Sequence, residues 1–366
     1  METIWITTAT VTAFTGILAF LLTLADRTIG NYGEMKIIIN EEKEYIVDGG
    51  DSLLASLIEE KIFIPSACGG KGTCGYCKVE VLEGGGPVLP TELPFLTEEE
   101  INRNVRLSCQ CKVKEDMKIR IPEELFNVRE YEVKVESIED MTSEIKKLRL
   151  RFKEGEEINF KPGQYMQLKT PIYEGNDEEV YRAYSIASPP SQKDYIDLII
   201  GYVPGGKATT YVHKFLKEGD IIEINGPYGD FYYQDKYDNE MVLVAVGTGM
   251  APILSILYHM KDNNINRKAT FYFGAKTPED LFLLDEMKDF EENLYDFKFV
   301  PTLSRVIDEH NWTGERGRVN VALDKHIKSP DDKEAYLCGS PGMIDSVISV
   351  LMEKGILEEL IYYDKF

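Results

Sequence analysis

Three of the six cysteines fall in one stretch, Pro65-Ser-Ala-Cys68-Gly-Gly-Lys-Gly-Thr-Cys74-Gly-Tyr-Cys77. In a chain of 366 residues, such clustering indicates metal ligation rather than a disulfide framework. Zinc is the alternative, but zinc motifs usually pair two C-x2-C knuckles and this stretch holds one. The interleaved glycines let the backbone wrap closely and point N–H groups at the sulfides of a negative cluster. The stretch therefore predicts a [2Fe–2S] cluster with a fourth thiolate supplied from elsewhere.

The fourth ligand has two candidates in Arg106-Leu-Ser-Cys109-Gln-Cys111. Residues two apart on an extended strand face the same way, so spacing leaves both Cys109 and Cys111 open. The four histidines are scattered and have no cysteine nearby, which argues against a Rieske centre. Upstream, the alternation over residues 35–49 predicts a β-hairpin, and Asp51 is the expected N-cap of a helix over residues 52–58.

Downstream of residue 126 the pattern changes to short alternating segments separated by turn residues. It predicts an antiparallel barrel with strands at 131–136, 147–152, 165–169 and 195–202.

Two strings in this part suit a phosphorylated ring cofactor. Arg182 offers a fork for phosphate, and Tyr184 lies on the same strand face and can stack on a ring. The hydroxyl of Ser185 points elsewhere and can bond a ring nitrogen. The second string, Gly205-Gly206-Lys-Ala-Thr209, is a glycine turn that opens a helix, and free N–H groups at a helix start form a pyrophosphate cradle.

A nucleotide-binding α/β domain is predicted from the apolar run at 241–246. The run leads into Gly247-Thr248-Gly249-Met-Ala-Pro252 and a helix over 253–260, and this strand, glycine turn and helix make a pyrophosphate site. Further strands are expected at 269–274, 297–302 and 334–337. Lys276 is the only positive charge just after the second strand, which favours NADH over NADPH because a 2′-phosphate wants an arginine or several cations.

The N-terminal segment Thr3–Ala25 carries no charge and is long enough to cross a bilayer as a helix. A cleaved signal peptide is the alternative, but no basic residue precedes the run. Arg27 and Lys36 follow it, which predicts a single-pass protein of the cell inner or plasma membrane with cytoplasmic redox domains. The formal net charge of -22 argues against a nucleic-acid partner.

Several strings resemble known families. The C-x5-C-x2-C and R-L-x-C-Q strings resemble β-grasp [2Fe–2S] ferredoxins, which selects Cys109 as the fourth ligand and leaves Cys111 as a neighbouring buried thiol. The later strings resemble the ferredoxin–NADP reductase-like flavoproteins, which implies FAD. By that resemblance Arg182 and Thr209 hold FAD phosphates, Tyr184 stacks on the isoalloxazine and Ser185 lies near its N5 atom.

The same resemblance places Cys338 beside the nicotinamide and makes Phe366 a shield over the flavin. Taken alone, Cys338 also fits a small buried residue at a strand end. The implied cofactor-binding set is Arg182, Tyr184, Ser185, Gly206, Thr209, Gly247, Thr248, Gly249, Pro252, Cys338, Gly339 and Phe366, of which Ser185, Cys338 and Phe366 are nearest the hydride transfer. The implied metal ligands are Cys68, Cys74, Cys77 and Cys109.

As a whole, the chain resembles the F subunit of the sodium-translocating NADH:quinone oxidoreductase. The implied fold is a transmembrane helix (1–30), a β-grasp α+β ferredoxin domain (33–127), an antiparallel β-barrel FAD domain (129–233) and an α/β NAD domain (238–366). The resemblance implies electron transfer from NADH through FAD and the [2Fe–2S] cluster to other membrane subunits and, through them, to quinone. One departure is the short segment between Gln164 and Arg182, where proteins of that family usually carry a long insertion. Two alternatives therefore stand beside it: a membrane-anchored reductase for an oxygenase or desaturase, and a non-enzymatic electron carrier.

Overall fold

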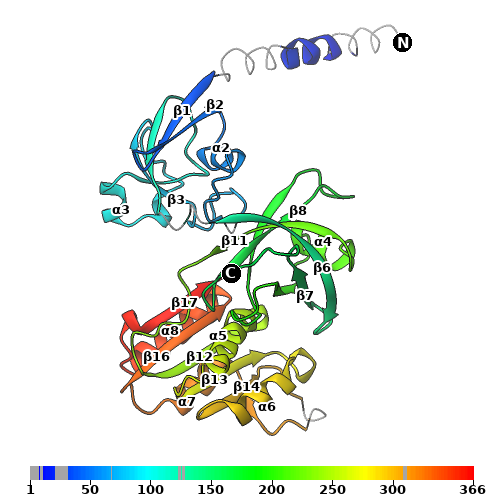
Figure 1. The fold of residues 1–366 in the computed structure, drawn as a ribbon, viewed down its shortest axis with the longest axis vertical. Coiled ribbons are helices and arrows are strands. Elements are labelled where there is room, and N and C mark those ends of the chain that lie inside the picture. Colours follow the sequence, from blue (N-terminus) through cyan, green and yellow to red (C-terminus); the bar gives the residue numbers. More distant parts are fainter. Residues whose placement is uncertain are drawn as a thin grey trace. The chain divides into compact units, whose positions relative to one another are not determined.

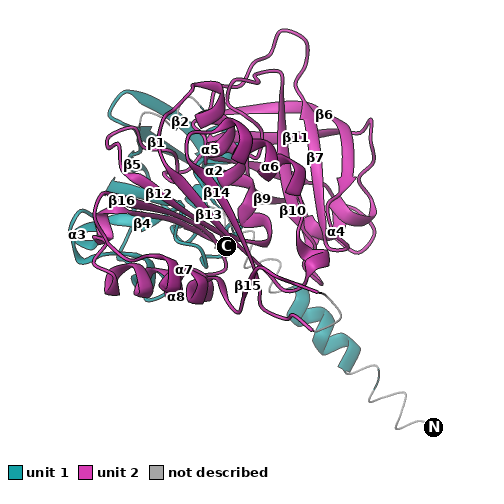
Figure 2. Cartoon of the chain, turned by 90° about the horizontal axis from the view of Figure 1, so that it is seen from below, with its two compact units in different colours: residues 1–128 teal, residues 129–366 magenta. Residues whose placement is uncertain are grey.

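The structure, a computed structural model, describes residues 8, 11–20, 32–66, 68–122, 125, 128–307 and 311–366. The chain forms two compact units, Met1–Val128 and Arg129–Phe366 (Figure 2). The predicted membrane span lies mostly outside the described residues. Residues 11–20 are helical, and within the described residues no helix is long and apolar enough to cross a membrane.

Unit 1 is built on a mixed five-stranded sheet in the order β2-β1-β5-β3-β4 (Figure 1). The predicted hairpin is confirmed as β1 and β2, and β5 pairs in parallel with β1. The predicted helix is confirmed as α2, whose buried leucines pack into the sheet's core. The bounds are β1 Glu34–Ile39, β2 Lys43–Asp48, α2 Leu53–Glu59, β3 Lys78–Glu83, η1 Leu93–Phe95, α3 Glu98–Asn102, β4 Val105–Leu107 and β5 Met117–Arg120.

The N-cap of α2 differs from the prediction. Ser52 is the N-cap, because its hydroxyl accepts the Ala55 N–H at 3.2 Å, and Asp51 precedes it. A serine three residues before the N–H that it caps satisfies one of the open donors of the first turn. Helix α2 therefore starts at Leu53, one residue later than predicted, and it still buries its leucines.

Unit 2 begins with an antiparallel six-stranded sheet in the order β10-β7-β6-β11-β8-β9. An isolated bridge between Ile186 and Leu198 joins the two edges of this order, so the predicted barrel is confirmed. Helix α4 adds Val212 to the apolar interior. The bounds are β6 Arg129–Asp140, β7 Ile145–Arg151, β8 Tyr165–Thr170, β9 Val180–Ser185, β10 Tyr195–Gly201, α4 Lys207–Lys214 and β11 Ile221–Tyr228.

The rest of unit 2 is a parallel sheet in the order β15-β14-β13-β12-β16-β17, as predicted for an α/β domain. Helices α5 and α6 pack on one face and α7 and α8 on the other (Figure 1). The bounds are β12 Glu240–Val246, η3 Gly247–Gly249, α5 Met250–Asp262, β13 Ala269–Ala275, η4 Pro278–Asp280, α6 Leu284–Asn293, β14 Phe297–Leu303, β15 Glu315–Arg316, α7 Val319–His326, β16 Lys333–Gly339, α8 Pro341–Glu353, η6 Glu358–Leu360 and β17 Ile361–Lys365.

A buried ion pair ties the segment between β11 and β12 to the parallel sheet. Arg267 Nη2 lies 2.7 Å from Glu334 Oε1, and the two side chains are 3% and 0% exposed. The same guanidinium donates to the carbonyl oxygens of Gln234 and Asn239. Tyr336 completes the group by donating to Glu334 at 2.7 Å and accepting the Gln234 N–H. The pair therefore fixes the chain where it passes from the barrel to the sheet.

We predict that Glu334→Ala lowers the free energy of unfolding by about 3 to 5 kcal/mol, because it leaves a buried guanidinium without its carboxylate. Denaturant unfolding of the full chain measures this. The control Asp345→Ala removes a carboxylate from the exposed pair with Lys365 and should change stability by less than about 1 kcal/mol. Equal effects of the two substitutions would contradict the proposed importance of burial.

Candidate redox site

The cysteines of the cluster stretch form one close pair. The Cys74 thiol donates to Cys68 with 3.4 Å between the sulfurs, whereas a disulfide would place them about 2.05 Å apart. Two thiolates on one tetrahedral metal ion with bonds of about 2.3 Å lie about 3.7 Å apart, so the pair has the spacing of ligands to one ion. The pKa of Cys68 is lowered, first because Cys74 donates to its sulfur and further because the N–H groups of Thr73 and Lys71 point at it.

Cys77 and Cys109 form the second pair. The Cys77 thiol donates to Cys109, which lowers the pKa of Cys109 and raises that of Cys77. The backbone of Gly70, at φ +82°, lies against Cys109: a Cβ added there would stand 4.0 Å from the cysteine Cβ. Four sulfurs in two pairs fit a [2Fe–2S] cluster, which takes two thiolates on each iron. No group of three or more His, Cys, Asp or Glu side chains in the described ranges surrounds a single ion position.

Cys111 points away from this arrangement. Strand β4 ends at Leu107 and residues 108–110 form a turn, so Cys109 and Cys111 do not share a face. The Cys111 thiol donates to the Gly85 carbonyl at 3.6 Å, and burial raises its pKa. This geometry supports Cys109 as the fourth ligand.

A second buried ion pair lies close to Cys109, at the end of β4. Arg106 and Glu92 are 3% and 0% exposed and meet through Nη2 and Oε2 at 2.7 Å. Glu92 also accepts the N–H groups of Leu89 and Leu107, and Arg106 donates to the carbonyl oxygens of Gly85 and Gly86. The pair therefore joins the loop at 84–92 to the end of β4, where Cys109 begins its turn.

The residues predicted to hold FAD lie on β9 and at the start of α4. Arg182 makes no ion pair with any described residue and donates to the Tyr181 carbonyl at 2.7 Å. Tyr184 lies two residues farther along β9 and packs against the barrel core, and burial raises its pKa. Ser185 ends the strand opposite Tyr165. An unpaired guanidinium beside a half-buried ring suits a phosphorylated aromatic cofactor.

The glycine turn before α4 forms a cradle. A Cβ on Gly206 would lie 2.6 Å from Thr209 Oγ1 and 3.0 Å from the Val203 carbonyl oxygen, so only glycine fits there. The Thr209 hydroxyl accepts the Val203 N–H at 3.1 Å and thereby holds the turn. Helix α4 has no side-chain cap, which leaves its first N–H groups available to a phosphate. These residues fit FAD. Thr209 contributes by holding the glycine turn in shape, so that the turn can accept a phosphate of the cofactor.

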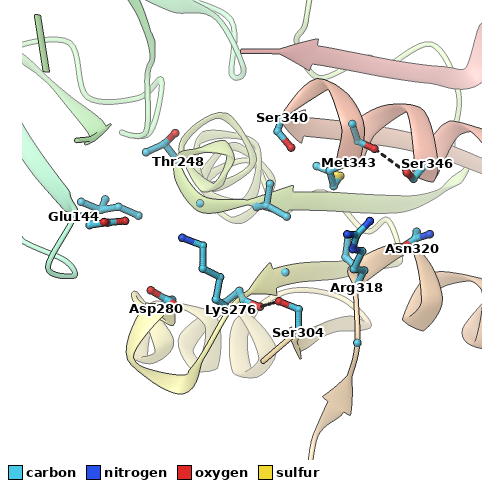
Figure 3. Close-up of a pocket in the computed structure, with 18 of the residues that line it drawn as sticks. Glu144, Thr248, Lys276, Asp280, Ser304, Arg318, Asn320, Ser340, Met343 and Ser346 are labelled. Atoms are coloured by element: carbon cyan, nitrogen blue, oxygen red, sulfur yellow. Dashed lines mark hydrogen bonds between the residues drawn. The ribbon is translucent and has the colours of Figure 1, made fainter. Parts of the chain in front are cut away.

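A cavity of about 650 Å³ opens at the carboxyl edge of the parallel sheet (Figure 3). It is lined by the predicted Gly247 and Thr248, and the β6–β7 hairpin of the barrel contributes Thr142, Glu144 and Ile145. Gly249, the last residue of the Gly247–Gly249 turn, packs against the end of β16. A Cβ on Gly249 would stand 2.2 Å from the Cys338 carbonyl oxygen, so the turn requires glycine at this position. Sequence reasoning also missed the lining that comes from the ends of β14 and β15, from the start of α7 and from the second turn of α8, namely Ser304, Gly317, Arg318, Val319, Asn320 and Ser346.

Three helices begin at this cavity. Helix α5 follows the Gly247–Gly249 turn, α7 starts at Val319 and α8 follows Ser340. None of the three has a side-chain N-cap hydrogen bond, so no side chain at these helix starts competes with a ligand for the open N–H groups. The converging positive ends of the helix dipoles suit the pyrophosphate of a dinucleotide.

Of the two residues predicted to lie nearest the nicotinamide, Phe366 lines the cavity and Cys338 does not. The Cys338 side chain is fully buried in the core, and burial raises its pKa. It does not line the cavity, which is reached instead by Ser340 farther along the chain. Phe366 does line the cavity and donates its N–H to the Gly339 carbonyl at 3.2 Å. Pro252 is buried in the first turn of α5.

Comparison with known protein families gives the same three parts in the same order. Family models match as a 2Fe-2S iron-sulfur cluster binding domain at residues 37–114, an oxidoreductase FAD-binding domain at 132–233 and an oxidoreductase NAD-binding domain at 243–348. Among solved structures, the chain is similar to the cytochrome P450 reductase GcoB of Amycolatopsis, with a TM-score of 0.73, 26% identity and coverage of 91% of this chain and 98% of that one. Fold and sites thus define a flavin- and iron–sulfur-dependent oxidoreductase.

Full-length relatives narrow this class. The chain is 36% identical over 390 residues to the F subunit of the Na(+)-translocating NADH-quinone reductase of Neisseria meningitidis, covering 96% of each. It is 35% identical over 408 residues to the F subunit of the same enzyme in Idiomarina loihiensis, covering 100% of each. The chain belongs to the family of Na(+)-translocating NADH-quinone reductase F subunits. Its domains fit electron transfer from NADH through FAD to the iron–sulfur centre.

We predict that Cys109→Ser abolishes the visible absorption of the cluster, whereas Cys111→Ser keeps it, because only Cys109 is paired with another sulfur of the set. Iron content and the absorption spectrum of the two purified variants measure the difference. The reverse result would show that Cys111 is the ligand.

We also predict that Glu92→Gln reduces the fraction of chain that retains its cluster and lowers the free energy of unfolding by about 3 kcal/mol, because it leaves Arg106 buried without a carboxylate. Glu100→Gln is the control, since Glu100 pairs with Lys78 at a more exposed position. Iron content per chain and urea unfolding report the two effects, and a Glu92→Gln variant as stable as the control would contradict the role of the pair.

Proposed function

We propose that this chain is the NADH-entry component of a sodium-translocating NADH:quinone oxidoreductase. One observation carries the proposal: a single chain combines a paired-cysteine site, a flavin cradle and a nucleotide cavity. Its full-length relatives carry the name of that enzyme's F subunit. When bound, FAD and the [2Fe–2S] cluster convert a two-electron hydride into single electrons. The quinone and the sodium chemistry belong to partner membrane subunits in this proposal.

The chain's own residues bind and orient. The Gly247–Gly249 turn before α5 and the start of α8 would hold the dinucleotide pyrophosphate, and Phe366 would shield the face of the flavin that receives the nicotinamide. Arg182 and the Gly206 turn would hold the FAD phosphates, Tyr184 would stack on the ring and Ser185 would bond to its edge. Cys68 and Cys74 would hold one iron, and Cys77 and Cys109 would hold the other. Cys338 supports this end of the sheet by packing beneath Gly249.

The proposed organisation follows the sequence. Residues 1–30 anchor the chain in the cell inner or plasma membrane, and cytoplasmic domains at 33–127, 129–233 and 238–366 carry the cluster, FAD and NADH. The uncharged run at 3–25 supports the anchor, and a cytoplasmic NADH pool supports the orientation.

A second candidate is a membrane-anchored reductase that supplies an oxygenase. The likeness to a P450 reductase over 91% of the chain favours it, as does the short link between β8 and β9. Residues 171–179 make this link, and Asn176 closes it by donating to the carbonyl oxygens of Pro171 and Glu178. Both candidates share the same route for electrons within the chain.

Gentle purification of the tagged chain from native membranes separates the candidates. We predict that multi-span subunits co-purify and that the preparation reduces quinone with NADH in a sodium-stimulated reaction. Mass spectrometry and quinone absorbance measure the two outcomes. Recovery with an oxygenase, or without any multi-span subunit, would replace the proposal by the second candidate.

A further inference from the structure

The side chain of Gln110 contacts a proposed cluster ligand. Gln110 follows Cys109 in the turn after β4, and its amide Nε2 donates to Cys109 Sγ at 3.8 Å. Its backbone N–H donates to the Leu107 carbonyl at 2.8 Å, so the turn fixes the direction in which the side chain leaves the backbone. A thiolate accepts hydrogen bonds and donates none, so the amide nitrogen rather than the amide oxygen belongs beside the sulfur.

The cluster stretch leaves room for this amide at a glycine. Gly72 has a φ of +70°, and a Cβ there would stand 2.6 Å from Gln110 Nε2 and 2.9 Å from its Cδ. A side chain at this position would displace the amide, and the backbone conformation also favours glycine. Among the groups that lower the pKa of Cys109, the Cys77 thiol has the largest effect and the Gln110 amide the next. The Gly72 N–H donates to the same sulfur.

The loop at 84–92 holds the other end of the amide. The Thr91 hydroxyl donates to Gln110 Oε1 at 3.3 Å, so the amide oxygen is engaged while the nitrogen faces the sulfur. The next residue, Glu92, belongs to the buried ion pair that fastens this loop to the end of β4. Thr91, Gln110 and Cys109 thus form a chain of hydrogen bonds that runs from a fixed loop to the sulfur.

Hydrogen bonds to a ligand sulfur change the affinity of an iron–sulfur cluster for an electron. Reduction by one electron adds negative charge to the cluster and its thiolates, and an N–H group that points at a sulfur stabilises this added charge. A donor to Cys109 therefore raises the reduction potential. The net charge of the chain acts in the opposite direction, because 63 acidic against 41 basic residues disfavour an added electron. A local donor offsets part of that effect.

We propose that Gln110, oriented by Thr91, raises the reduction potential of the cluster by donating a hydrogen bond to Cys109. This inference rests on the proposed function, in which Cys109 is a ligand and the cluster receives single electrons from FAD. Gln110 is a positioning residue, because it acts through the ligand and takes no part in the transfer itself. The loop at 84–92 thereby affects the electron affinity of the cluster as well as the place of its fourth ligand.

Potentiometric titration of the full chain with its cofactors, followed by paramagnetic resonance of the reduced cluster, measures the potential without turnover. Gln110→Met removes the donor and keeps the length of the side chain. We predict that it lowers the equilibrium constant for one-electron reduction about tenfold, a shift of about 59 mV to a more negative potential. The control Asn102→Met removes an exposed amide from α3 and should leave the potential unchanged. An unchanged potential in Gln110→Met, or an equal shift in the control, would overturn the proposal.

A second substitution tests the chain of hydrogen bonds. Thr91→Val keeps the shape of the side chain and removes its hydroxyl, and we predict a constant about threefold lower than that of the wild type. In the Gln110→Met background the same substitution should have no effect, because the amide through which Thr91 acts is gone. Equal effects in the two backgrounds would contradict the chain. Thr91→Val retains Gln110, so its shift decides the proposal if Gln110→Met binds no cluster.

Failure of the proposed function has a different signature in the same samples. A wild-type cluster that a chemical reductant reduces but that NADH leaves oxidised would contradict the electron route. The potentials of the variants would still decide the role of Gln110, because the titration supplies electrons without NADH.

Discussion

The buried ion pair between Arg106 and Glu92 is the interaction that holds the loop at 84–92 against the end of β4 in unit 1. Three of the proposed cluster cysteines come from one stretch, whereas the proposed fourth ligand, Cys109, follows the end of a separate strand. Glu92 accepts from both the Arg106 guanidinium and the Leu107 N–H, two residues before Cys109. A charge pair excluded from water tolerates little displacement, because moving either partner leaves a buried charge alone. The pair thus fastens the loop at 84–92 to the strand end that precedes Cys109.

Unit 2 builds its sites from strand ends and helix starts. Its parallel sheet brings the ends of strands distant in sequence to one edge, where Thr248, Lys276 and Arg318 line a single cavity. Helices α5, α7 and α8 begin there without side-chain caps, an arrangement that suits the phosphates of a dinucleotide. The barrel adds its own hairpin to the wall, so the flavin-binding and nucleotide-binding parts share one boundary within the unit.

Much of this arrangement could be predicted from local sequence. The C-x5-C-x2-C spacing, the alternation of the barrel strands and the glycine turn after the apolar run each reflect nearby residues, and the structure forms a hairpin, barrel and parallel sheet where they were expected. Prediction failed where the spacing of residues along the chain does not decide which way a side chain points or which distant residue lies near it. Cys109 and Cys111 diverge because residues 108–110 turn, and an assumption of extended strand concealed this. Arg318 and Lys276 line the same cavity because β15 lies beside β14, and only the string Gly314-Glu-Arg-Gly317-Arg318, with its two glycines, pointed to a turn there.

The central claim is that one chain takes up hydride and releases single electrons, and anaerobic titration with NADH tests it most directly. Absorbance follows the flavin, and paramagnetic resonance follows the reduced cluster in the same sample. The account predicts that the chain takes up about three electrons, two with bleaching of the flavin and one with the signal of a reduced [2Fe–2S] cluster. Uptake of about two electrons with the cluster still oxidised, or no bleaching of the flavin at all, would contradict it.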